Sequence, residues 1–310
     1  MKIFFNELLE VYESLMTGKE VSLPPLELTC REFLLESSRI IMNSDYEKKH
    51  YTYWENKFKE YLIPVDKRPL YRSFGVQEPP AGFNDAKKDF DKARWFIYIT
   101  AFENKQAMHD LAGVLGITAQ VALLATFFMS AHISFETDKI LAASPIPGRD
   151  KRSRQIIGNL FGNIFLKSVV NPSMTLKEVM MKMYMDFLQS CRYPVFEFEK
   201  FDPFETRDKC EFFVNYLDVN DRKDIKTAMP DNYVHKPEKE YYSLSYIVYE
   251  YKNGFTFRWA YQTDIYTREI IECLAGLHLQ VLACFLKNPE TSMGELSHFL
   301  RGKDQKSVAG

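Results

Sequence analysis

Apolar residues recur at helical spacing through the first part of the chain. In the opening segment they place one apolar side chain on each turn of a predicted helix, at Phe4, Leu8, Val11 and Leu15. Thr17-Gly18 predicts the end of this helix. Two more helices are expected over residues 27–42 and 45–62, while residues 63–92, with four prolines and many charges, predict a long surface connection.

The pattern alternates between strands and helices from residue 94 onward. Strands are expected at 94–99, 138–143, 165–170 and 211–219, and helices at 103–115, from Thr118, at 176–191 and at 268–287. Lys252-Asn253-Gly254 stands between two alternating segments, which predicts a β-hairpin within residues 243–264. The order indicates a mixed α/β fold, and the hairpin argues against an all-parallel sheet.

One stretch, Leu111 to Phe135, carries no charged residue and is long enough to span a bilayer. It also contains Gly116-Ile117-Thr118, which is typical of a helix end followed by a new N-cap. We therefore expect two buried helices separated by a turn, and no membrane span.

Composition narrows the class of protein. The chain has 310 residues, 46% of them hydrophobic, which predicts two lobes or one large α/β unit. Its net charge of −2 gives no electrostatic reason to expect nucleic acid or an anionic membrane as a partner. Five scattered cysteines form no CxxC pair, which indicates reduced thiols in the cytoplasm and no metal site.

Common catalytic motifs are missing from the sequence. It contains no GxSxG, HExxH or Walker sequence and no serine in an LGGxS setting. Ser144 ends a predicted strand but has no base assigned to it. The acidic pairs Glu197/Glu199 and Asp202/Glu205 fall in a loop-like stretch and are expected to be solvated.

Seven segments, in order, resemble the condensation domains of nonribosomal peptide synthetases. The most specific is ILAASPIPGRDKRSRQIIGNLFGNIFLK, which is similar to the family's strand, PxxGR turn and IGxFVNT-like segment. The others are IFFNELLEVYESLMTGKE, LPPLELTCREFLLES, HYTYWENKF, LAGVLGITAQVALLATFFMSAH, CRYPVFEFEKF and WAYQTDIYTREIIECLAGLHLQVL. The resemblance covers residues 3 to about 300 and corresponds to the C-terminal two-thirds of such a domain.

The resemblance implies an α/β, chloramphenicol-acetyltransferase-like, two-lobed fold with mixed sheets and an incomplete N-terminal lobe. Residues 1–92 would be the remainder of that lobe and a connection, residues 93–300 the C-terminal condensation lobe, and residues 301–310 a tail. The family motif positions imply a set of tunnel or structural residues: Ser144, Pro147, Gly148, Arg149, Gly158, Asn163, Tyr193, Pro194 and Asp264.

Two departures from the family bear on function. The family's HHxxxDG motif, with its catalytic histidine, is not in this sequence, and none of the six histidines is paired or in an HxxxD setting. We therefore assign no catalytic residue and no metal ligand. In the IGxFVNT-like segment Gly162 stands where the family has Asn, with Asn163 one position later.

Arg149 fits the family pattern, in which this arginine pairs with the aspartate of HHxxxDG. Without that aspartate, Arg149 must be solvated, find another carboxylate, meet a partner chain or hold its own turn. An apolar patch is expected near Phe4, Phe5 and Leu8, close to Arg149.

Three functions stay open from the sequence. The first is a condensation-domain fragment of antibiotic and secondary-metabolite biosynthesis, which transfers an acyl or peptidyl group between carrier thioesters to form an amide, and which is inactive alone. The second is a non-catalytic docking module, and the third a stand-alone acyltransferase. The expected partners are peptidyl carrier proteins, an N-terminal condensation fragment or neighbouring modules. No bound cofactor is expected, because phosphopantetheine arrives on the carriers.

Overall fold

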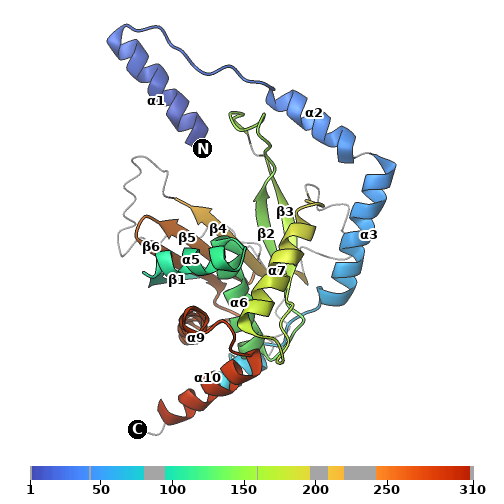
Figure 1. The fold of residues 1–310 in the computed structure, drawn as a ribbon, viewed down its shortest axis with the longest axis vertical. Coiled ribbons are helices and arrows are strands. Elements are labelled where there is room, and N and C mark those ends of the chain that lie inside the picture. Colours follow the sequence, from blue (N-terminus) through green and yellow to red (C-terminus); the bar gives the residue numbers. More distant parts are fainter. Residues whose placement is uncertain are drawn as a thin grey trace.

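A six-stranded mixed sheet forms the centre of the molecule (Figure 1). The computed structural model describes residues 2–41, 43–79, 95–158, 160–195, 209–219 and 242–307. The strands, in the sheet order β1-β6-β5-β4-β2-β3, are β1 (Trp95–Phe102), β6 (Gly254–Gln262), β5 (Leu244–Tyr251), β4 (Phe212–Asp218), β2 (Leu141–Pro147) and β3 (Phe161–Lys167). Strands β2, β4 and β5 run parallel to one another, whereas β3 and β6 run antiparallel to their neighbours.

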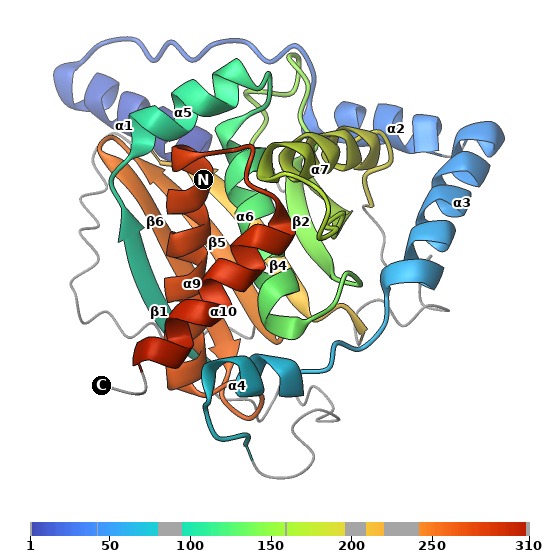
Figure 2. The same ribbon diagram turned by 60° about the horizontal axis from the view of Figure 1, so that its bottom comes forward.

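Helices cover one face of this sheet (Figure 2). They are α5 (Lys105–Val114), α6 (Ala119–Phe135), α7 (Leu176–Ser190) and α9 (Arg268–Lys287), with α10 (Met293–Ser307) packed beside α9. Nearly every side chain of α6 is buried, because this helix lies between the sheet and its helical neighbours. Burial on all sides explains why its sequence is apolar all round.

One histidine lies inside this core. His278 of α9 is fully buried, and its Nε2 lies 3.0 Å from Oγ1 of Thr126 and 2.9 Å from the hydroxyl of Tyr246. Burial lowers the pKa of His278 to about 3, so this histidine is neutral and structural.

The first helices of the chain form an arm outside the sheet (Figures 1 and 2). The arm consists of α1 (Lys2–Thr17), α2 (Cys30–Ile41) and α3 (Ser44–Tyr61). A short helix, α4 (Arg68–Phe74), then returns the chain to the core, where the Tyr71 hydroxyl donates to the Ile265 carbonyl at 2.9 Å.

The structure confirms most predicted elements and corrects four. The break at Gly116 to Thr118, the hairpin and the 268–287 helix are as predicted. Residues 63–92 are not only a surface connection, because α4 lies within them and buries Leu70 and Tyr71. The 138–143 and 165–170 predictions miss the bounds of β2 and β3, and α10, running through residue 300, was not predicted.

Two apolar segments resemble membrane spans by length and composition. Helix α9 is long and apolar enough to cross a bilayer, but half of its most apolar window is buried within the protein. The pair α5 and α6 would qualify only as one span, and the two helices are bent by 98° at the break between them.

Candidate functional site

The structure brings eight of the nine predicted site residues to one end of β2 and β3. Ser144 and Pro147 lie on β2, and Asn163 lies opposite Pro145 on β3. The tip loop, which we define as residues 148–160, holds Gly148, Arg149 and Gly158. Tyr193 and Pro194 precede Val195, whose backbone exchanges two hydrogen bonds of 2.7 and 2.8 Å with Asn163.

Asp264 lies at the opposite end of the strands from the other eight residues. It follows the carboxyl end of β6, and β6 runs antiparallel to β5, which in turn runs parallel to β4 and β2. The carboxyl ends of β2 and β6 therefore point in opposite directions. The exposed Asp264 is separate from the group around Ser144 and Arg149.

The chain changes direction between β2 and β4. Among the described residues, these parallel neighbours pair only at Ala142–Phe212 and Ala143–Phe213. The strand that follows β2, β3, lies on one side of this pair, and the strand that follows β4, β5, lies on the other side. Pro145 has no N–H with which to extend the pairing. In open α/β sheets, ligands bind at the carboxyl ends of strands at such a switch point.

Ser144 lies where β2 and β4 separate. Its residue is 1% exposed, and its hydroxyl has no hydrogen-bond partner within the described part of the chain. An unpaired buried hydroxyl costs about 1–3 kcal/mol, so most are satisfied in folded proteins. A serine hydroxyl can donate one hydrogen bond and accept others.

Arg149 holds its own turn, which decides among the alternatives that the sequence left open. Its guanidinium donates to the carbonyls of Ser153 at 2.9 Å, Ile156 at 2.6 Å and Gly158 at 2.8 Å. These bonds use three of the five guanidinium donors and fix the shape of the tip loop. Asp150 adds to the same turn by accepting from the backbone N–H and hydroxyl of Ser153, both at 2.9 Å.

Helix α3 fixes the segment that carries Tyr193 and Pro194. The Tyr46 hydroxyl donates to the Arg192 carbonyl at 3.0 Å, Trp54 Nε1 donates to the Tyr193 carbonyl at 2.7 Å, and His50 Nε2 lies 3.0 Å from the Pro194 carbonyl. Three successive turns of one helix thus satisfy three consecutive carbonyls. The ring of Tyr193 lies against Tyr46, His50 and Tyr53.

A buried ion pair completes the attachment of α3. Lys57 Nζ lies 2.9 Å from a carboxylate oxygen of Asp186 on α7, and both side chains are about 95% buried. The same ammonium donates to the Phe165 carbonyl of β3 at 2.8 Å and to the Ser190 hydroxyl at 2.9 Å. Burial lowers the pKa of Lys57 to about 8, although the charge of Asp186 opposes this shift.

The pair is not visible in the sequence, because 129 residues separate its partners. The only local signal was that Lys57 falls among the aromatic residues of HYTYWENKF, on the face that also carries Tyr53 and Trp54. The ammonium lies 5.3 Å and 5.2 Å from the ring centroids of these two residues, which is within cation–π range.

A second polar cluster lies under α5, near the carboxyl ends of β4 and β5. These ends point in the same direction as the carboxyl end of β2. The buried carboxylate of Glu250 accepts from Lys105 Nζ at 2.6 Å, from His109 Nε2 at 3.0 Å and from the Tyr216 hydroxyl. These contacts hold α5 against the ends of β4 and β5. His109 is therefore committed to Glu250 through one ring nitrogen.

The other histidines lie away from Ser144 or are already bonded. His132 bonds the Thr137 carbonyl at 3.0 Å, and His298 lies on α10. His235 lies outside the described residues. Among the described residues, no group of three or more His, Cys, Asp or Glu side chains is arranged to hold a metal ion.

The expected apolar surface is present on α1. Phe4, Phe5 and Leu8 are 45%, 43% and 49% exposed, and Leu9 and Tyr12 are exposed further, at 57% and 58%. We call the side that carries these five residues the apolar face of α1. Residues spaced three to four apart share one side of a helix, so this face runs along most of α1.

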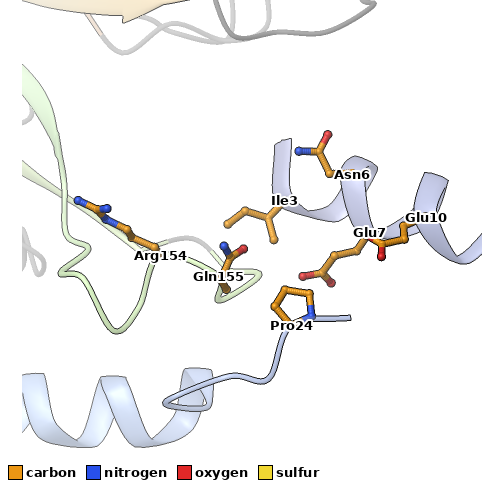
Figure 3. A pocket seen from close by; sticks show the side chains of 7 residues that line it. All are labelled: Ile3, Asn6, Glu7, Glu10, Pro24, Arg154 and Gln155. Atoms are coloured by element: carbon orange, nitrogen blue, oxygen red, sulfur yellow. The ribbon is translucent and has the colours of Figure 1, made fainter. Parts of the chain in front are cut away.

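The opposite side of α1 looks toward the tip loop (Figure 3). A hollow of about 280 Å³ separates them, lined by Ile3, Asn6, Glu7, Glu10, Pro24, Arg154 and Gln155. Gln155 points toward Ile3, and the carboxylate of Glu7 lies over Pro24 (Figure 3). The apolar face is therefore directed away from both the hollow and the tip loop.

Known proteins resemble this chain over almost its whole length. A family model described as the condensation domain matches residues 1–307. Gramicidin S synthase 2 of Brevibacillus brevis is 24% identical over 312 residues, which cover 96% of this chain. Tyrocidine synthase 2 of Brevibacillus parabrevis is 22% identical over 321 residues, or 98% of the chain. The chain spans only 6% and 8% of the lengths of these two relatives.

Solved structures show the same fold. The first condensation domain of the calcium-dependent antibiotic synthetase, in complex with a substrate analogue, superposes with a TM-score of 0.68 at 15% identity, covering 94% of this chain and 62% of that one. The X-domain in complex with OxyB from teicoplanin biosynthesis also gives 0.68, at 16% identity, covering 96% and 66%. This chain has the chloramphenicol-acetyltransferase-like α/β fold, and it belongs to the condensation-domain family of nonribosomal peptide synthetases.

Proposed function

We propose that this chain provides one wall of a condensation site, at which an acyl or peptidyl group passes from one carrier-bound thioester to the amine of another. The observation that carries the proposal is the buried, unpartnered hydroxyl of Ser144 at the separation of β2 and β4. Family membership supplies the reaction class, and the switch point is where an α/β sheet binds ligands.

The bond changes define what the site must do. The amine nitrogen attacks the thioester carbonyl, a C–N bond forms, the C–S bond breaks, and the sulfur leaves as a thiol with the proton that the amine loses. The Ser144 hydroxyl can hold a polar atom of the substrate while Arg149 keeps the neighbouring loop in shape. Orientation of two tethered reactants supplies up to about 7–11 kcal/mol of the barrier in favourable cases.

None of the histidines that the structure describes hydrogen-bonds the Ser144 hydroxyl. His109, His132 and His278 are bonded elsewhere. We propose that a segment bearing HHxxxDG completes the site and packs on the apolar face of α1. Phosphopantetheine would arrive on carrier proteins in the cytoplasm, and neighbouring synthetase modules are the other proposed partners.

The test is a reconstitution with two loaded carrier proteins and a separately made segment that bears HHxxxDG. Mass spectrometry should detect the amide product when chain and segment are both present, and none with the chain alone. Ser144→Ala should lower the rate about tenfold or more, as expected when a hydrogen bond made in the transition state is lost. Ser173→Ala is the matched control, because Ser173 lies on an exposed turn.

Three outcomes decide the proposal. Product from the chain alone would remove the need for the segment. An unchanged rate in Ser144→Ala would remove the assigned role of the hydroxyl. Binding of carriers without product, even with the segment, would favour a docking module.

One comparison favours that docking module as a second candidate. The X-domain, with the same TM-score as the condensation domain, is solved in complex with another protein, OxyB. The sequence of the present chain contains no HHxxxDG motif. A docking module would bind a carrier or an enzyme equally well before and after Ser144→Ala.

A further inference from the structure

Strand β3 is the last in the sheet order of the described residues, so one side of its backbone faces away from β2. Asn163 uses this outward side, since its N–H and C=O exchange two hydrogen bonds with Val195. In an antiparallel pair every second residue directs its N–H and C=O the same way, so Phe165 and Lys167 also face outward. We call the outward groups of Asn163, Phe165 and Lys167 the edge of β3, where another strand could add.

An ion pair occupies most of this edge. Lys57 Nζ donates to the Phe165 carbonyl at 2.8 Å, and the Lys167 N–H donates to the Asp186 carboxylate at 3.2 Å. The ammonium thus stands where the N–H of a neighbouring strand would be, and the carboxylate stands where its carbonyl would be. Because Nζ also lies 2.9 Å from Asp186, one connected and buried pair makes both contacts.

The segment of residues 191–195 is placed to add to the same edge. Its Val195 already forms an antiparallel bridge with Asn163. In an antiparallel pair, each step forward along one strand meets one step back along the other. The register of this bridge, continued by two residues, would therefore place Tyr193 opposite Phe165.

The segment leaves the edge after the single bridge. The Tyr193 N–H donates to the Ser190 carbonyl at 3.0 Å, and the Tyr193 carbonyl accepts from Trp54 at 2.7 Å, so both groups bond elsewhere. Pro194 does not exclude the continued register, because there its nitrogen would face away from β3, where no N–H is needed. The position that Tyr193 would take at the edge is filled by Lys57.

We infer that the Lys57–Asp186 pair takes the place of a further strand: its hydrogen bonds close the edge of β3 and end the pairing of residues 191–195 at Val195. In this role the pair gives the fold one register rather than added stability. Buried ion pairs can often be replaced by apolar residues with no loss of stability, whereas their hydrogen bonds have fixed directions. The inference concerns the folding of the chain and does not depend on the reaction proposed above.

The test removes both edge hydrogen bonds and keeps the buried space filled. The double variant of Lys57→Met with Asp186→Leu does this, because both new side chains are apolar and of similar length to the old ones. Its midpoint of denaturation should be equal to or above that of the wild type. That measurement establishes that the variant folds before its register is examined.

Nuclear magnetic resonance then reads the register of the segment. In the double variant, new contacts between α-protons should join Ile164 to Pro194 and Leu166 to Arg192, which are the close pairs of the continued register. Hydrogen exchange of the Tyr193 N–H should slow by up to about tenfold, the equivalent of one hydrogen bond. The wild type should show neither change.

Asp186→Asn is the matched control. Its side-chain oxygen can still accept from the Lys167 N–H, and Lys57 can still donate to the Phe165 carbonyl as a neutral amine. This variant removes the charge of the pair and keeps its hydrogen bonds at the edge. It should therefore show the wild-type register, with no new α-proton contacts.

Four results would overturn the inference. A folded double variant with the wild-type register would show that the contacts of α3 alone direct the segment away from β3. The new α-proton contacts in Asp186→Asn would show that charge, and not hydrogen bonding, ends the pairing. A double variant that does not fold would show that the pair is needed for stability. A dimer of the double variant in light scattering, without the new contacts, would show that the edge takes a second chain instead of residues 191–195.

Discussion

Helices α3 and α2 are consecutive in the chain and both contact the β2–β3 region, yet they are held in opposite ways. Helix α3 uses aromatic donors and one buried lysine, and Trp54 is fully buried against Phe58 and Phe165. Helix α2 uses one half-exposed ion pair, and its Leu34 and Leu35 are about half exposed. We therefore expect the strength of each attachment to follow burial of the contact rather than the presence of charge.

Removal of one partner of the buried pair should have the largest effect. Asp186→Ala leaves the ammonium of Lys57 buried without its carboxylate, which is expected to lower the free energy of unfolding by about 3–5 kcal/mol. Chemical denaturation measures the loss. Arg152→Gln removes the ion pair between the tip loop and α2, and it provides the comparison. It should lower the free energy of unfolding by less than about 1 kcal/mol. Equal costs would contradict the contrast between the two helices.

The pH dependence of stability should identify Lys57. Its pKa is about 8 when folded and 10.5 when unfolded, so between these values the unfolded chain binds more protons. Stability should therefore rise with pH over this range, by roughly 3 kcal/mol in total. Denaturation series at pH 8 and 10 in wild type and Lys57→Met isolate the contribution. A rise that persists unchanged in Lys57→Met would assign it to other groups.

Loss of a single buried donor should have a smaller effect. Trp54→Phe removes the hydrogen bond to the Tyr193 carbonyl, which leaves a partly buried carbonyl unpaired, at a cost of about 1–3 kcal/mol. Thermal or denaturant unfolding measures this cost. Thr52→Ala on the exposed side of the same helix is the control and should be close to neutral. A neutral Trp54→Phe would mean that this hydrogen bond does not contribute to the attachment of α3.

The smallest effect is expected on α1. Leu9→Ser and Tyr12→Ser should change the free energy of unfolding by no more than about 0.5 kcal/mol, because both side chains are more than half exposed. Phe58→Ala in α3 is the contrast, since a buried phenylalanine is worth about 3–5 kcal/mol. A large loss from Leu9→Ser would show that the apolar face of α1 is covered within the chain.

Local signals in the sequence located many elements but not all of their bounds. Thr118 caps α6 through its side chain, as the Gly116 to Thr118 pattern predicted. Helix α4 was missed although its signals were present: Pro69 in its first turn and Gly75 after its end, with a φ of 65°. Strand β2 was placed too early because Pro145 and Pro147 suggested a turn. A proline is tolerated here because the pairing of β2 with β4 stops before it.

The candidate site was predictable only in part. Family motifs indicated Ser144, Arg149 and Asn163, and the register of β2 and β3 brings them to one end of the sheet. The sequence could not show that Asp264 is apart from these residues, because only the direction of β6 places it at the other end of the strands. The role of Arg149 was open, since its acceptors are backbone carbonyls that any residue type provides.

The sequence by itself determined the family, the helices of the first 62 residues, the mixed α/β class and the missing HHxxxDG motif, because periodicity and motifs are local properties of a chain. Only the tertiary structure decided that Ser144 is buried without a partner among the described residues, that Lys57 meets Asp186, and that an exposed ion pair holds α2. Each of these depends on which groups distant in sequence share a water-excluded space. That exclusion, rather than residue type, sets how strongly a charge or a hydroxyl acts.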